Sequence, residues 1–241
     1  MKSYASDKKR THTEPECALH VQLRNTMSAV PFVDLRVPFD PKPIVAEMRL
    51  IKHLLVGHRA KIGGKPTKGW FALNLKGLHG NAELTRSTRH YQSLISTIRD
   101  VPNAYRLTLI AQQCPKTLAL LRSIVRLKDC SRVRILALAP GGHIPPHRDQ
   151  RNFGTVLHAS VVEPSDCTFW IAPSRGNSTS AHLIRVPFVS GSFFLVDVSR
   201  CHTVSNRSRR WRYHLVVEGP VKAHALRHAL VFSRGMKCAE P

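Results

Sequence analysis

Residues 140–149 read PGGHIPPHRD and place His147 two positions before Asp149. Successive side chains of a β-strand point to opposite faces, so residues i and i+2 share a face. On a strand, His147 and Asp149 can therefore reach one metal ion together. Such a pair is a weak signal alone, and its weight depends on the sequence around it.

The chain around this segment has the pattern of an all-β region. From residue 132 onward, short apolar or alternating runs recur, separated by turns such as Gly141-Gly142 and Ser190-Gly191. Short strands at nearly regular spacing are typical of a sandwich or jelly roll. The predicted strands cover residues 133–139, 143–149, 155–162, 168–172, 182–187, 192–198, 202–206 and 211–218.

A third metal ligand has to come from another strand. His202 opens a late predicted strand, and Arg212 lies on the strand that follows it. Two histidines and one carboxylate leave three positions open on an iron ion. A guanidinium can clamp a carboxylate by two parallel hydrogen bonds. This order predicts a mononuclear non-haem iron site of His147, Asp149 and His202, with Arg212 holding the far carboxylate of 2-oxoglutarate.

The register of the last strand leaves one alternative open for the carboxylate clamp. Arg212 has arginine neighbours, and Arg209 or Arg210 would take its place if the strand were shifted.

Three stretches of the chain resemble the aspartyl/asparaginyl β-hydroxylase family, whose bacterial members include free-proline hydroxylases. They are RILALAPGGHIPPHRD from residue 134, LHASVVEPSDCTFWI from residue 157 and FFLVDVSRCHTVSNRSRRWRYHLVVEG from residue 193. A weaker likeness runs back to Trp70. The resemblance implies a double-stranded β-helix, Fe(II), 2-oxoglutarate and oxygen, and the hydroxylation of an amino-acid side chain, free or within a peptide.

The resemblance also implies roles for individual residues. It assigns iron ligation to His147 and His202, and co-substrate binding to Arg212. His158 matches a family histidine near the co-substrate carboxylate, although a histidine on a core-facing strand is as often a packing residue.

This chain departs from the animal members of the family in three places. Those members have glycine where this chain has Asp149, which follows the proline-hydroxylase-like branch. A serine and an arginine of the animal co-substrate site correspond to Leu136 and Val156. We therefore expect the second carboxylate end of 2-oxoglutarate to be held differently here.

The first half of the chain predicts mainly helices. Apolar residues at helical spacing predict a helix from Asp40 to about Val56, and Pro115 opens a clearer one. Strands are predicted near residues 30–37 and 70–75, a short helix over 91–98, and a basic, glycine-rich loop over 57–69. The predicted organisation is a polar arm over 1–28, a helix-rich supporting region over 29–130, a jelly-roll hydroxylase core over 131–220 and a tail over 221–241, with 29–220 as one compact domain.

The composition is strongly basic, with 37 Lys and Arg against 15 Asp and Glu and a formal net charge of +22. Such an excess favours acidic substrates or polyanions as partners. The alternative function is therefore a non-catalytic, cupin-like metal-binding protein or a basic nucleic-acid-associated protein. No nucleic-acid-binding motif supports the second. No apolar run reaches the roughly 18 residues of a membrane helix, and the N-terminus has no secretory signal, so we expect a cytoplasmic protein.

Overall fold

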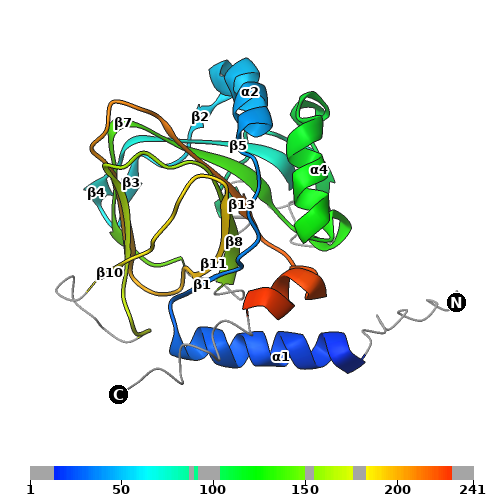
Figure 1. Ribbon diagram of the computed structural model, residues 1–241. Helices are drawn as coiled ribbons and strands as arrows, with labels where there is room; N and C mark the ends of the chain where they lie inside the picture. The colour runs from blue at the N-terminus through cyan, green and yellow to red at the C-terminus, as the bar shows by residue number, and fades with distance from the viewer. Residues whose placement is uncertain (1–13, 87–89, 92–103, 150–154, 176–182, 230–241) are drawn as a thin grey trace, which may run out of the picture.

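A computed structural model describes residues 14–86, 90–91, 104–149, 155–175 and 183–229. The second half is a curled antiparallel sheet (Figure 1). Its strands are β7 (Val133–His147), β8 (Thr155–Val162), β9 (Cys167–Ile171), β10 (Ile184–Arg185), β11 (Ser192–Asp197), β12 (His202–Asn206) and β13 (Arg212–Val217).

Strand β7 belongs to both halves of the sheet. Its first part pairs with β13, in the order β7-β13-β8-β11, and its second part pairs with β12, in the order β7-β12-β9-β10. Two four-stranded antiparallel layers that share a bent strand form a double-stranded β-helix, so the predicted jelly roll is confirmed. The bend allows one strand, which ends at His147, to replace the two predicted over 133–139 and 143–149, so Asp149 lies just beyond the strand.

The bend in β7 depends on glycine. Gly141 has a φ of +65°, which side chains rarely adopt. At Gly142, a Cβ atom would lie 2.7 Å from both the carbonyl oxygen of Ala139 and the side chain of Leu138. The pair of glycines therefore lets the strand turn sharply and still carry His147 at its end.

The first half contributes more strand than the sequence predicts. β5 (Lys68–Leu78) pairs with the outer edge of β7, and β1 (Phe32–Asp34) pairs with β11. The predicted basic loop carries short strands and a hairpin. These smaller elements are β2 (Val56–Gly57), β3 (Lys61–Ile62) and β4 (Lys65–Pro66), and outside the loop β6 (Tyr105–Leu107) pairs with β5.

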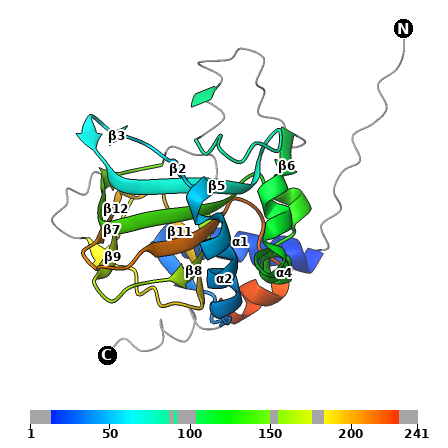
Figure 2. The same ribbon diagram turned by 90° about the horizontal axis from the view of Figure 1, so that it is seen from above.

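The helices are α1 (Glu14–Ala29), α2 (Lys42–Ile51) and α4 (Pro115–Ile124), with 3-10 turns η1 (Lys52–Leu54), η3 (Leu109–Gln113) and η4 (Leu127–Asp129). α2 and α4 lie on the side of the sheet away from β9, β12 and β3 (Figure 2), and α1 runs below β1 and β11 (Figure 1). α2 and α4 bury their apolar stripes in the core between helices and sheet. Buried Glu47 of α2 accepts hydrogen bonds from the backbone of Lys116 and Thr117, which stabilises the N-terminus of α4.

The predictions of an N-terminal arm over 1–28 and a C-terminal tail over 221–241 are wrong in part. Residues 14–28 are not an arm but belong to α1, whose Met27 is buried in the core. The tail folds back through a bridge between Val221 and Val125, and residues 223–229 form a helical turn with Leu226 buried. Apart from Tyr91, the predicted helix over 91–98 lies outside the described residues.

Within the described ranges, no helix is both long and apolar enough to cross a membrane.

Candidate metal centre

Three potential metal ligands converge at one end of the barrel. His147 ends β7 and His202 opens β12, and the two are register partners across the strands. Asp149 follows β7, where its backbone N–H donates to the carbonyl of Val198 at 2.9 Å. The ligand atoms of the three side chains all lie within 4.8 Å of one another. The structure thus brings together the three residues that the sequence predicts as a metal site.

Both histidines present the same ring nitrogen to this point. Nδ1 of His147 lies 2.9 Å from the carbonyl oxygen of Pro145, and Nδ1 of His202 lies 2.9 Å from that of Arg200. A carbonyl oxygen only accepts, so each Nδ1 carries the hydrogen and each Nε2 keeps a lone pair. Fixing a histidine through its other nitrogen is the usual way in which proteins orient a metal ligand.

The protonation states also suit a cation. Burial, together with the neighbouring His202, lowers the pKa of His147 to about 4, so the imidazole is neutral near pH 7. Burial alone would raise the pKa of Asp149, but His202, His147 and the nearby arginines lower it, so the carboxylate is ionised. Two imidazoles, each with a free Nε2 lone pair, and one ionised carboxylate form the donor set that non-haem Fe(II) prefers. The residues present therefore fit an iron ion.

A pocket opens beside the three ligands, between the two layers of the barrel. Most of its wall is apolar and includes Leu136 and Val156, the positions where the animal members carry serine and arginine. The polar side chains on its wall include Arg212, His158, Arg134 and Arg59.

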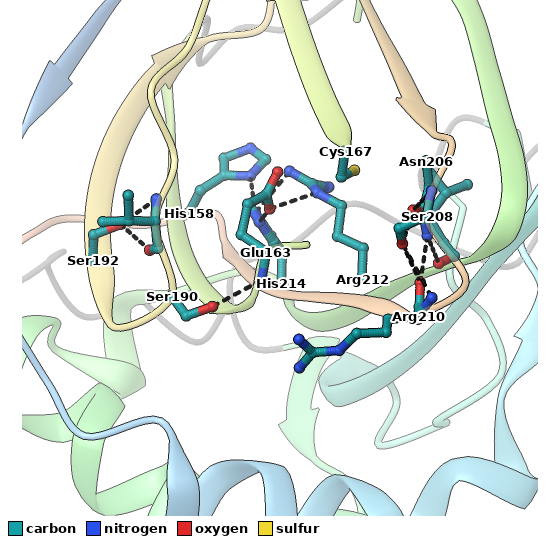
Figure 3. Close-up of polar contacts among 12 residues, drawn as sticks. His158, Glu163, Cys167, Ser190, Ser192, Asn206, Ser208, Arg210, Arg212 and His214 are labelled. Atoms are coloured by element: carbon teal, nitrogen blue, oxygen red, sulfur yellow. Dashed lines mark hydrogen bonds and ion pairs between the residues drawn. The ribbon is translucent and has the colours of Figure 1, made fainter. Parts of the chain in front are cut away.

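Arg212 is buried and already paired (Figure 3). Its Nε donates to Oε2 of Glu163 at 2.8 Å, and its Nη2 donates to Nδ1 of His214 at 3.2 Å. Burial would raise the pKa of Glu163, but Arg212 and His214 lower it, so this carboxylate is ionised. Arg209 and Arg210 are exposed, which removes the alternative of a shifted register.

His158 completes this polar cluster. Nε2 of His214 donates to Glu163 at 2.6 Å, so its Nδ1 is an acceptor, and Nδ1 of His158 lies 3.4 Å from it. His158 must then carry its hydrogen on Nδ1. Its Nε2 is buried at the pocket without a partner among the described residues. Burial and the nearby charges, His214 first, lower the pKa of His158 well below its usual range, so it is neutral.

A family model described as Aspartyl/Asparaginyl beta-hydroxylase matches residues 70–220. The chain belongs to the aspartyl/asparaginyl β-hydroxylase family. The match begins at Trp70, at the start of β5, and includes all strands of the barrel. Membership of this family, together with the His-Asp-His cluster, identifies the protein as an Fe(II)- and 2-oxoglutarate-dependent hydroxylase.

Three solved structures are distantly similar to this hydroxylase. A prolyl-4-hydroxylase from Pseudomonas putida is 12% identical, with 87% of this chain and 100% of the other covered and a TM-score of 0.46. A prolyl hydroxylase from Trichoplax adhaerens, in complex with a hypoxia inducible factor peptide fragment, is 11% identical, with 92% and 98% covered and a TM-score of 0.47. A 2OG-Fe(II) oxygenase family oxidoreductase from Burkholderia pseudomallei is 13% identical, with 87% and 92% covered and a TM-score of 0.45. No curated protein matches the chain.

The sequence did not identify four polar residues around this pocket: Arg59, Arg134, Glu163 and His214. Two of them carried a signal. His214 follows Arg212 by two residues on one strand, and Arg134 precedes Leu136 by two, so each shares the face of a pocket residue. Arg59 comes from a loop and Glu163 from the end of β8, and no motif marks either of them.

Proposed function

We propose that the protein hydroxylates an amino-acid side chain, free or within a peptide, and that His147, Asp149 and His202 hold its iron. One observation carries the assignment of the ligands. The Nδ1 atoms of both histidines are bound by backbone carbonyls, so both Nε2 lone pairs are free next to the ionised Asp149. When bound, Fe(II) supplies the activation of oxygen that is coupled to the oxidative decarboxylation of 2-oxoglutarate to succinate.

The residues of the chain then have separate tasks. Nη1 of Arg212 has no partner within the described part of the chain, so it can donate to the far carboxylate of 2-oxoglutarate. Glu163 and His214 hold this guanidinium in place from the other side. The apolar wall that includes Leu136 and Val156 excludes water from the substrate, which favours reaction at a C–H bond.

The test is an anaerobic absorbance titration of metal-free protein with Fe(II) and then 2-oxoglutarate. We expect a visible charge-transfer band in the wild type, and its loss in His147→Ala, His202→Ala and Arg212→Ala. Arg209→Ala, which changes an exposed arginine near the same strand, should keep the band. Folded wild-type protein that shows no band would contradict the assignment. If the band forms, succinate release can be used to screen amino acids and peptides.

A further inference from the structure

A second hollow lies next to the iron pocket and is strongly basic. This outer groove has a volume of about 440 Å³ and is lined by Arg59, Ala60, Lys61, Arg86 and His90. Arg59 also lines the pocket beside the metal ligands, so the two hollows share one wall. A molecule whose reactive carbon lies in the pocket can therefore extend past Arg59 into the groove.

The groove is built by specific contacts. Nε of Arg86 donates to the carbonyl oxygen of His58 at 3.1 Å, and Nη1 of Arg86 donates to Nε2 of His90 at 3.0 Å. The preceding residue, Thr85, is held by Nδ1 of His58 on its hydroxyl and by Nη1 of Arg134 on its carbonyl. Arg86 is thus held in a fixed position, in contrast to a freely solvated surface arginine.

The positive charges of the groove are not compensated by its own acids. Within the described residues, neither Lys61 nor Arg86 has a carboxylate partner. In the described part of the chain, Arg59 is paired with Asp149, whose Oδ1 lies 4.0 Å from Nη1. Asp149 is a proposed iron ligand, so a bound cation would take up its charge and leave Arg59 unpaired.

The wall of the iron pocket next to Arg59 also has more positive than negative charge. Of the described carboxylates, Arg134 and Arg132 share one, that of Glu218, at 2.8 and 2.7 Å. Nε of Arg134 is buried and has no hydrogen-bond partner among the residues that the structure describes, and Arg134 lines the pocket. Arg212, in contrast, is neutralised by Glu163. The uncompensated charge next to the iron site therefore lies toward Arg59 and Arg134, and not toward the co-substrate clamp.

We propose that the outer groove and Arg59 bind an anionic group, a carboxylate or a phosphate, of the molecule that is hydroxylated. The inference rests on the proposed function, because it concerns the substrate of the same iron site. Arginine forks match the oxygens of carboxylates and phosphates. A pocket that has already desolvated part of its positive charge binds an anionic molecule more favourably than its neutral amide.

The test uses simple anions on the protein loaded with Fe(II) and 2-oxoglutarate under anaerobic conditions. Sodium sulfate represents a phosphate and sodium acetate a carboxylate, each titrated by calorimetry against sodium chloride at equal ionic strength. We expect at least one of them to bind the wild type, with affinity lowered at least tenfold in Arg59→Gln and in Arg86→Gln. Lys65→Gln is the matched control, because Lys65 belongs to the same hairpin as Lys61 and does not line the groove.

Each outcome decides between the hypotheses. Binding of sulfate alone assigns a phosphate to the groove, and binding of acetate alone assigns a carboxylate. No binding, or equal binding in the arginine variants and the wild type, would overturn the proposal. The charge-transfer band is recorded in the same samples. A band without anion binding would support the proposed iron centre and contradict the role of the groove. Groove-dependent anion binding without a band would support an anion site and contradict the proposed iron centre.

Discussion

Glu163 and Arg212 form a buried ion pair inside the barrel, with Oε2 of Glu163 2.8 Å from Nε of Arg212. A carboxylate of the chain therefore already contacts the guanidinium that is proposed to bind the far carboxylate of 2-oxoglutarate. His214 is hydrogen-bonded to both members of the pair and holds their side chains in place. The pair gives the clamp a fixed position and also reduces its charge.

Glu163→Gln separates these two effects. Losing the carboxylate leaves the Arg212 charge uncompensated in the barrel, so we expect the free energy of unfolding to fall by about 3 kcal/mol in urea titrations. The same charge then attracts 2-oxoglutarate more strongly, and we expect about tenfold tighter binding in the anaerobic titration, or ~1.4 kcal/mol. The exposed Glu83→Gln is the control. Weaker 2-oxoglutarate binding in Glu163→Gln would show that Glu163 matters more for holding Arg212 in position than for reducing its charge.

His214 makes the stability of the metal-free protein depend on pH. Burial, together with the charge of Arg212, lowers the pKa of His214 from 6.5 to about 4. Below about pH 6.5 the unfolded chain therefore binds a proton that the folded protein does not. Stability is lost as the pH falls from about 6.5 to about 4, and this residue accounts for roughly 3 kcal/mol of the loss.

Urea unfolding at several pH values between 7 and 4 measures this loss. His214→Gln should show a flatter pH dependence than the wild type, whereas His53→Gln, at an exposed position, should follow the wild type. Parallel curves for the wild type and His214→Gln would contradict a buried neutral histidine.

The barrel could be predicted because its signals are local. Alternation and turn residues located β8 and β12 at their observed bounds, and the i, i+2 rule placed His147 and Asp149 together. The pairing of Glu163 with Arg212 could not be predicted in this way. It depends on the register of β8 against β13, which shifts between Tyr213 and His214.

The elements outside the barrel were harder to predict from the sequence for a related reason. Polar and apolar residues are mixed along α1, and its place in the fold depends on Met27 and on contacts with distant residues. Arg59 reaches the pocket from a loop whose sequence shows only glycines and positive charge. Long-range contacts of this kind have no periodicity that a single sequence can show.

Arg200 links α1 to the metal site. Its fully buried guanidinium bonds Asp197 at 3.0 Å and the carbonyl oxygens of Met27 and Ser28 at the end of α1. Its own carbonyl oxygen holds Nδ1 of His202. We expect Arg200→Met to lower the free energy of unfolding by about 3–5 kcal/mol, because Asp197 loses a buried partner.

The same variant should bind Fe(II) about tenfold more weakly, since the residue that orients His202 is displaced. Urea unfolding and the Fe(II) titration measure the two effects, with exposed Arg207→Met as the control. Wild-type iron affinity in a destabilised Arg200→Met would mean that the backbone orients His202 without the side chain.

Gly142 tests whether the bend in β7 places the metal ligand at its end. An alanine Cβ would lie 2.7 Å from the carbonyl oxygen of Ala139, so the backbone has to move. We expect Gly142→Ala to cost about 1–3 kcal/mol in urea unfolding, as overpacking does, and to weaken Fe(II) binding because His147 is carried by the same strand. Gly57→Ala is the matched control, because its Cβ meets nothing within 4 Å. Since this control also lies in a strand, equal losses in both variants would point to a general cost of replacing glycine, and would argue against the bend as the feature that positions His147.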